Sequence, residues 1–290
     1  MLPRFFACFR KVFSRGSSKK DSIRVTEDSS LSTDEPIKES PVIVELFSSQ
    51  GCAESAEAEL LISRLGRGDF NLDVSVVVLA FHVDYWDYLG WKDPYASSLF
   101  TVRQKTYVEY LELDSIFTPQ IVVNGASQCV GNDEAAMLSA IASASRFPSP
   151  SFKVKTFTKN LQNRFEKVCF QADFRIAASN SLKLTLNGSL KTEIESQGVS
   201  VMVAIYQSGF ITDCPEGKNR GRMLSNNYVV KKMEKLCTVK NASAKKMISG
   251  TVTIPLWEGF NSSKCGLVLF VEDTCHRIIG AQHFTLPNTI

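Results

Sequence analysis

Apolar and polar residues alternate in more than one way along this chain of 290 residues. Residues 42–47 form a short apolar run rich in β-branched side chains, and residues 53–65 place their leucines on one side of a helix. Residues 74–81 are apolar almost without interruption, as in a strand that is buried on both faces. The pattern therefore predicts a strand, a helix and a second strand within a parallel or mixed sheet.

The pattern continues in the same style up to residue 147. It predicts two further helices and two further strands, at 96–111, 133–144, 120–124 and 128–130. Asn124-Gly125 is typical of the tight turn of a hairpin and joins the two strands. The resulting order, β-α-β-α-β-β-α, predicts one compact α/β domain over residues 41–147.

A different pattern follows Pro148-Ser149-Pro150, which interrupt the chain. It consists of short strand-like runs, at 152–157, 168–174, 181–186, 199–206, 251–255, 266–272 and 278–284. Residues 228–236 are the one stretch here with helical spacing. We expect residues 151–290 to form a β-rich, sandwich-like domain.

Residues 1–40 have a polar and charged composition without a hydrophobic period, which predicts a disordered tail. Residues 1–20 hold six basic residues and no acidic one, so an organelle transit segment for a mitochondrion or chloroplast is an alternative. A membrane-surface segment acylated at Cys8 is a third reading. The segment lacks the apolar core of a secretory signal, so we expect reduced thiols in the cytoplasm. No apolar run approaches the length that spans a bilayer, so an integral membrane protein is not expected.

The charge becomes informative when the chain is divided. Residues 1–40 hold 8 basic and 6 acidic residues, residues 41–150 hold 6 and 14, and residues 151–290 hold 19 and 10. The three segments therefore carry +2, −8 and +9 within a net charge of +3. We expect the acidic and basic segments to dock onto each other, with separate partners as the alternative, and the overall balance favours neither nucleic acid nor anionic lipid.

Cys52 is the first candidate for chemistry. It follows the first predicted strand and a turn, and it precedes a helix whose free N–H groups and dipole favour a thiolate. Ser55 stands three residues later, so the motif is C-x-x-S where a dithiol oxidoreductase has C-x-x-C. A small buried residue at the end of the strand is the structural alternative.

Thr118-Pro119 is the second element of this candidate site. In the predicted order of elements, a proline at the start of the third strand lies near the beginning of the first helix. A cis proline there exposes the backbone before it to a bound peptide or thiol. The plain alternative is a proline that only begins a strand.

Two longer motifs accompany these residues, FHVDYWDYLGWKDP at 81–94 and TPQIVVNG at 118–125. With SSQGC at 48–52, NRGR at 219–222 and NYVVK at 227–231, the chain resembles an uncharacterised thioredoxin-like family of bacteria and plants over residues 42–285. The resemblance implies a thioredoxin fold followed by a β-rich domain, and it implies no known substrate.

Members of that family in bacteria often have a second cysteine where this chain has Ser55, so a dithiol cycle is not expected here. A monothiol route fits the residues better. In it, the Cys52 thiolate attacks a glutathione mixed disulfide or a sulfenic acid, and free glutathione resolves the product. The Ser55 hydroxyl is expected to donate a hydrogen bond to the thiolate. Resolution by Cys129 is an alternative.

The aromatic loop after the second strand supplies the remaining candidates. His82, Asp84 and Asp87 are expected at the same end of the sheet as Cys52, where they activate the thiol or form a structural cluster. Trp86, with its aromatic neighbours, is expected to wall a groove for substrate together with Thr118, or else to fix the loop. The cationic segment at 217–222 suggests an anion site, an exposed loop or, preferably, docking onto the acidic segment.

These residues lead to one preferred function and two alternatives. The preferred function is monothiol thiol–disulfide exchange at Cys52, with Pro119 shaping the substrate edge, a thiol- or disulfide-bearing protein as partner and glutathione as co-substrate. No other cofactor and no metal are expected, because the remaining cysteines lack the close pairs of a zinc site. The alternatives are an inactive binding or scaffold protein of thioredoxin fold and a peroxide-sensing thiol.

Overall fold

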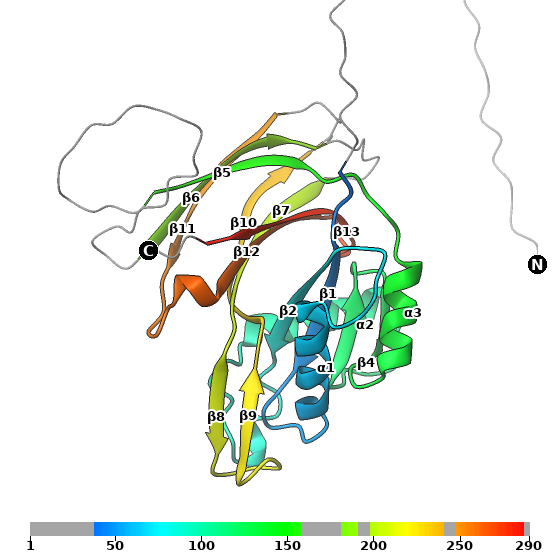
Figure 1. The fold of residues 1–290 in the computed structure, drawn as a ribbon, viewed down its shortest axis with the longest axis vertical. Coiled ribbons are helices and arrows are strands. Elements are labelled where there is room, and N and C mark those ends of the chain that lie inside the picture. The colour runs from blue at the N-terminus through cyan, green and yellow to red at the C-terminus, as the bar shows by residue number, and fades with distance from the viewer. Residues whose placement is uncertain (1–37, 158–180, 191–197, 241–246, 287–290) are drawn as a thin grey trace, which may run out of the picture. The chain divides into compact units, whose positions relative to one another are not determined.

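The computed structural model describes residues 38–157, 181–190, 198–240 and 247–286 (Figure 1). Strands hold more of the described residues than helices do, and three α-helices and two short 3₁₀ helices lie among these residues. The largest sheet has eight strands, in the order β13 (Ile278–Thr285), β12 (Cys265–Glu272), β7 (Val199–Gln207), β10 (Val229–Val239), β2 (Val76–His82), β1 (Val42–Ser48), β3 (Gln120–Val123) and β4 (Ser127–Val130). The predicted tail over residues 1–37 and the predicted strand at 168–174 lie outside the described residues.

The eight-stranded sheet is mixed. Strand β1 pairs with β2 in parallel, and β10 joins β2 in parallel through Val229 and Ala80. The other neighbouring strands pair antiparallel. Strands from both predicted segments therefore belong to one sheet, and the predicted mixture of helix and sheet is confirmed, whereas the boundary at residues 148–150 stays a prediction.

Helices cover both faces of the first half of this sheet. Helices α1 (Ser55–Arg67) and α3 (Glu134–Ser143) pack on the face that includes Val44 and Leu46. Helix α2 (Ser98–Tyr110) packs through Phe100 and Tyr107 on the opposite face, against Phe47. Burial on both faces explains why β1 and β2 are nearly continuous apolar runs.

A second, three-stranded sheet packs against the other half. It consists of β5 (Ser151–Phe157), β6 (Ser181–Ser189) and β11 (Met247–Pro255), in the order β11-β6-β5. In β7, Val201 and Val203 face this second sheet, while Met202 and Ala204 face the cluster that contains α2. The alternation along a strand thus places β7 between two apolar layers.

The helix predicted at residues 228–236 is wrong, because these residues belong to strand β10. The apolar residues of β10 recur at helix-like intervals, at 229, 230, 233, 236 and 237. Two irregularities in its pairing with β7, between Val230 and Lys232 and between Lys235 and Cys237, shift the side-chain alternation. A β-bulge adds one residue to a strand and thereby imitates a helical period.

The hairpin of β8 (Phe210–Cys214) and β9 (Arg222–Asn226) was not predicted. The cationic segment at 217–222 spans the end of its turn and the first residue of β9. Strand β9 packs beside α1 (Figure 1), so this segment lies against the first half of the chain. The short 3₁₀ helices at Asp87–Leu89 and Ser262–Lys264 complete the described elements.

A buried ionic cluster joins β1, α2 and β12. Arg103 donates to Glu45 at 2.7 Å and to Glu272 at 2.9 Å, and both carboxylates are buried. The Tyr107 hydroxyl donates a short hydrogen bond to Glu45. Among the ion pairs of the described residues, only Arg103–Glu272 joins the two predicted segments, and its cation lies in the acidic segment. The net charges of the segments therefore do not describe this contact.

The start of α3 offers a first quantitative prediction. Asp133 is its N-cap residue, and its carboxylate accepts a hydrogen bond from the Ala136 backbone N–H at 2.9 Å. Asp133→Ala leaves that N–H without its cap and is expected to lower the free energy of unfolding by about 1 kcal/mol in urea denaturation. Asp114→Ala, at an exposed aspartate outside any helix, is the control and should change it by less than about 0.5 kcal/mol. Equal losses in the two variants would contradict the capping role.

Candidate functional site

Cys52 lies in the turn between β1 and α1, close to the chain segment before β3. Its Sγ is 3.6 Å from the carbonyl oxygen of Thr118. The Thr118-Pro119 peptide bond is cis. The structure therefore brings together Cys52, Thr118 and Pro119, three residues that the sequence singled out from positions 66 residues apart.

The side chain beside the thiol is Glu54. Cys52 Sγ donates to Glu54 Oε2 at 3.2 Å. Hydrogen bonds from its own backbone N–H and from the thiol lower the pKa of Glu54 below its ordinary value. Glu54 is thus ionised at neutral pH, and its carboxylate is the side-chain acceptor of the thiol's hydrogen bond.

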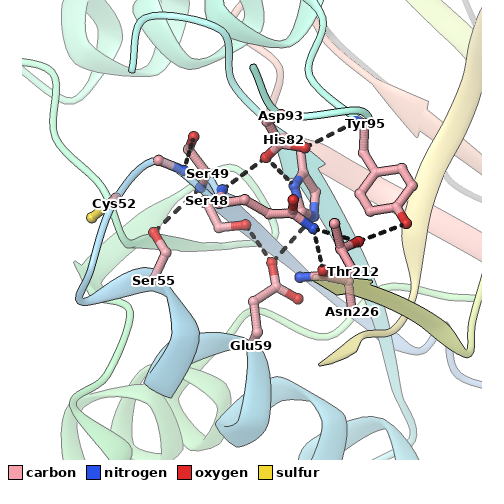
Figure 2. A network of polar contacts seen from close by, with 12 residues as sticks. Ser48, Ser49, Cys52, Ser55, Glu59, His82, Asp93, Tyr95, Thr212 and Asn226 are labelled. Carbon is pink, nitrogen blue, oxygen red and sulfur yellow. Dashed lines mark hydrogen bonds and ion pairs between the residues drawn. The ribbon is translucent and has the colours of Figure 1, made fainter. Parts of the chain in front are cut away.

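Ser55 makes a different contact from the one expected. Its hydroxyl accepts a hydrogen bond from the Ser49 backbone N–H at 3.3 Å, and Figure 2 shows the Cys52 sulfur pointing away from this contact. Helix α1 begins at Ser55, three residues after Cys52. The described hydrogen bonds of the thiol are with Glu54 and Thr118, and a bond from Ser55 to a Cys52 thiolate stays a prediction.

The β8–β9 hairpin covers the Cys52 turn. Asn219 is 1% exposed, and its amide donates to the carbonyl oxygen of Gln50 at 2.7 Å and to that of Cys52 at 3.0 Å. Arg222 in turn donates to the Asn219 amide oxygen at 2.8 Å. Cys52 is 0% exposed, so a substrate reaches its sulfur only after neighbouring residues have moved.

Trp86 lies next to the same residues. Its indole N–H donates to the Thr118 hydroxyl at 2.7 Å, and the Lys218 ammonium lies 4.6 Å from its ring centre. Lys218 belongs to the hairpin turn, so the turn contacts the aromatic loop by a cation–π interaction. Trp86 and Thr118 are therefore in contact, and the two residues connect Cys52 to the hairpin, whereas their role in a substrate groove stays a prediction.

His82 lies in a buried polar network beneath the turn (Figure 2). Its Nδ1 is 2.7 Å from Asp93, and its Nε2 is 3.3 Å from Glu59, which is close enough for an ion pair although not aligned for a hydrogen bond. Burial alone would lower the pKa of His82, but Asp93 and Glu59 outweigh burial and raise it to about 10. The imidazole is therefore protonated at neutral pH, and it is fully buried rather than positioned on a substrate surface.

The network also fixes the turn itself. Asp93 accepts a hydrogen bond from the Gln50 backbone N–H at 2.8 Å, and the same residue accepts one from Tyr95 N–H at 2.9 Å. The Gln50 side chain donates to Asn226 at 2.8 Å and to Thr212 at 3.0 Å. Burial raises the pKa of Asp93, yet His82 and these bonds lower it further than burial raises it. The charged network thus holds the turn, the aromatic loop and the hairpin together.

The other expected candidates lie in different contacts. Asp84 accepts a hydrogen bond from Thr101 of α2 at 2.6 Å, and Asp87 accepts one from the Asp93 backbone N–H at 3.2 Å. Burial, together with Asp133, raises the pKa of Cys129 to about 11. The Cys129 thiol is therefore protonated at neutral pH, which disfavours a resolving role.

Three residues of this site were not singled out from the sequence. Glu59 lies on the buried side of α1, and a charged residue among the buried positions of an amphipathic helix is the signal that was available. Asp93 belongs to the quoted aromatic motif, and Asn219 to the cationic segment. Nothing local in the sequence pairs Asn219 with Cys52, 167 residues away.

Two further features concern metals and membranes. The described residues hold no group of three or more His, Cys, Asp or Glu side chains arranged to bind a metal ion. Within the same residues, no helix has the length and apolar character needed to cross a bilayer.

The fold and the site define a mixed α/β protein with a buried thiol beneath a β-hairpin. The chain belongs to the family described as protein of unknown function (DUF1223), whose model matches residues 43–272. A search of curated proteins finds no match.

Two solved structures are similar over most of the chain. The crystal structure of protein AGR_C_4864 from Agrobacterium tumefaciens is 22% identical, with a TM-score of 0.54, and the match covers 87% of this chain and 98% of that one. HBP35 of Porphyromonas gingivalis is 12% identical, with a TM-score of 0.53, and the match covers 86% of this chain and 76% of that one. At these identities the likeness concerns the fold alone.

Proposed function

We propose that this protein carries out monothiol thiol–disulfide exchange through Cys52. The observation that carries the proposal is the position of its sulfur, 3.6 Å from the Thr118 carbonyl oxygen, in the turn between β1 and α1. A peptide aligned along the Thr118 backbone would present its disulfide to that sulfur. The order β1-α1-β2 followed by β3-β4-α3 supports a thioredoxin-like first half for such a site.

The proposed reaction has two exchange steps. The Cys52 thiolate attacks the glutathione sulfur of a protein–glutathione mixed disulfide, and the protein leaves as its thiolate. Free glutathione, as its thiolate, then attacks the glutathione sulfur of the Cys52 mixed disulfide, which releases the Cys52 thiolate and oxidised glutathione. Overall, one protein–glutathione mixed disulfide and one free glutathione give the protein thiol and oxidised glutathione, and the proton that the free glutathione loses is taken up by the released protein thiolate. Because the cycle consumes glutathione, we assign it to a reducing compartment such as the cytoplasm.

Movement of the β8–β9 hairpin is the step that gives access to the thiol. Asn219→Ala removes the two hydrogen bonds that the Asn219 amide donates to the turn, and it leaves those from Gln50 to the hairpin in place. We expect this variant to alkylate at Cys52 at least about fivefold faster than the wild type at pH 7.5, since each lost hydrogen bond is worth about 1 kcal/mol. Arg220→Ala, at the exposed neighbouring residue, is the control and should leave the rate unchanged. Site-mapping mass spectrometry measures the rate.

Turnover itself is tested with a glutathionylated peptide and free glutathione. The wild type should release the peptide thiol and form a glutathione adduct at Cys52. The Cys52→Ser variant should do neither. If Cys52 is alkylated in Asn219→Ala, but neither the wild type nor Asn219→Ala forms the glutathione adduct, the redox proposal is wrong.

The burial of Cys52 favours a second candidate, a binding protein that uses the same fold without turnover. Its thiol is 0% exposed, and the ionised Glu54 lies against it. In this case Cys52 acts as a small packing residue, and Cys52→Ala binds the partner as the wild type does. The adduct experiment therefore separates the two candidates.

A further inference from the structure

A cavity of about 110 Å³ lies between α1 and the β8–β9 hairpin, and its lining includes Ser55 but not Cys52. Its walls come from α1, from β9 and from the turn after β1. Its polar lining includes Glu59 and Asn226, and its apolar lining includes Leu60 and Met223. The proposed exchange at Cys52 uses none of these four side chains.

Glu59 gives the cavity an unsatisfied acceptor. The residue is 3% exposed, and one carboxylate oxygen, Oε1, accepts a short hydrogen bond from Ser48 and lies 3.3 Å from His82. The other oxygen, Oε2, is buried and has no hydrogen-bond donor among the described residues. Figure 2 shows this second oxygen turned away from Ser48 and His82, toward the side of Asn226. A buried carboxylate oxygen without a donor is costly, so a donor from a ligand is favoured.

The local charge selects a cation. Asp93 and Glu59 both face the single His82 imidazole, which leaves the group of three with an excess of negative charge. Arg222 is the one cationic residue in the described lining of the cavity; its guanidinium donates to the neutral amide of Asn219, and the ion pairs of the described residues include none between Arg222 and Glu59. A positively charged donor next to Glu59 would therefore form a charge-assisted hydrogen bond with the free carboxylate oxygen, and the low dielectric of the buried site would strengthen this bond.

The rim of the cavity favours a ligand in which an apolar group is attached to the cation. Leu60 is 60% exposed and Met223 is 67% exposed, although both line the cavity. They come from α1 and β9, so they flank the cavity from its two walls. Methylene groups that pass between them would bury apolar surface, as lysine stems do on other protein surfaces. A compact inorganic cation would leave these side chains without a partner.

We propose that this cavity binds a primary alkylammonium group, with the ammonium at Glu59 and the methylene stem between Leu60 and Met223. The group belongs either to a lysine side chain of a protein partner or to a free alkylamine. Both sources share the chemistry that the cavity recognises, and the experiment below distinguishes them.

The probe for the free amine is n-butylammonium, and n-butanol is its neutral counterpart. Isothermal titration of the full chain should give saturable binding of n-butylammonium at least about tenfold tighter than that of n-butanol, because a hydrogen bond to a charged group exceeds the roughly 1.4 kcal/mol that corresponds to tenfold. A short peptide with one lysine, compared with its Nε-acetyl-lysine form, tests the protein source. Tighter binding by the lysine peptide than by n-butylammonium assigns the cavity to a partner protein, and the reverse order assigns it to a free amine.

Two variants connect the binding to this cavity. Glu59→Gln should abolish it, but this residue also bonds Ser48, so a variant on the surface is needed as well. Met223→Lys places the chain's own ammonium at the rim and should weaken n-butylammonium at least fivefold. Met247→Lys introduces the same change at a residue that is 72% exposed on β11, outside the cavity lining, and should bind as the wild type does.

The proposal is wrong if n-butylammonium does not bind, if n-butanol binds equally well, or if both methionine variants behave alike. Cys52→Ser should retain amine binding in full, because the Cys52 side chain is not part of the cavity lining. The redox proposal and the amine-binding proposal are therefore tested independently of each other.

Discussion

Arg103→Met should lower the free energy of unfolding by about 3–5 kcal/mol, the usual cost of removing one partner from a buried ionic group. Glu45 and Glu272 lie at 2.7 Å and 2.9 Å from the guanidinium, and both would be left buried without their cation. Burial alone would raise the pKa of Glu272, but Arg103 and His276 hold it below its ordinary value. Chemical denaturation with urea measures the loss.

The control lies on the same helix. Lys105→Met removes an exposed cation from α2, and it should change the free energy of unfolding by less than about 0.5 kcal/mol. Combining Arg103→Met with Glu272→Gln removes one of the stranded charges and should recover part of the loss. If Arg103→Met is as stable as the Lys105→Met control, the ionic cluster does not hold α2 to β12.

The elements of residues 42–144 could be predicted because their signals are local. Apolar runs of strand length alternate there with helical periods, and the boundaries carry the usual residues, such as Asp133 before α3 and Asn124-Gly125 between β3 and β4. The Asn124 and Gly125 backbones both have positive φ, as that turn requires. Local preference and final structure agree in this half of the chain.

The later part of the chain was harder to predict because pairing with distant strands decides its structure. Strand β10 has a helix-like spacing of apolar residues, and only its pairing with β7 reveals that bulges produce it. The hairpin of β8 and β9 has short strands with exposed residues such as Ile211 and Met223, so no clear period marks it. Tertiary contacts outweigh local propensity in both cases.

Some residues of the candidate site could be predicted from the sequence and others could not. Cys52 and Pro119 could be selected from sequence because each has a recognisable local context, and their order along the chain predicts that they meet. Glu59 and Asn219 matter through contacts with residues that are distant in sequence or hidden in a helix pattern. A polar residue that belongs to a buried network looks like a surface residue until its partners are known.

His82 is expected to make the protein less stable as the pH rises through the neutral range. Its pKa is about 10 in the folded protein, against an ordinary value of 6.5. A raised pKa stabilises the folded state fully below about pH 6.5, and this contribution is lost as the pH approaches 10. The slope for one proton is at most about 1.4 kcal/mol per pH unit, so we expect a loss of about 1 kcal/mol per unit between pH 7 and 8.5 in urea denaturation.

Two variants assign that slope to His82. Asp93→Asn removes the stronger of its charge partners and should flatten the slope, because the pKa of His82 then falls toward its ordinary value. His283→Gln should leave the slope above pH 7 unchanged, since burial lowers the pKa of His283 and confines its titration to more acidic pH. The imidazole can also be followed directly by NMR in the folded wild type, which does not depend on the stability of any variant. A His82 resonance that titrates near pH 6.5 would mean that Asp93 and Glu59 do not hold the proton, and the turn that carries Cys52 would then rest on neutral hydrogen bonds instead of a charged network.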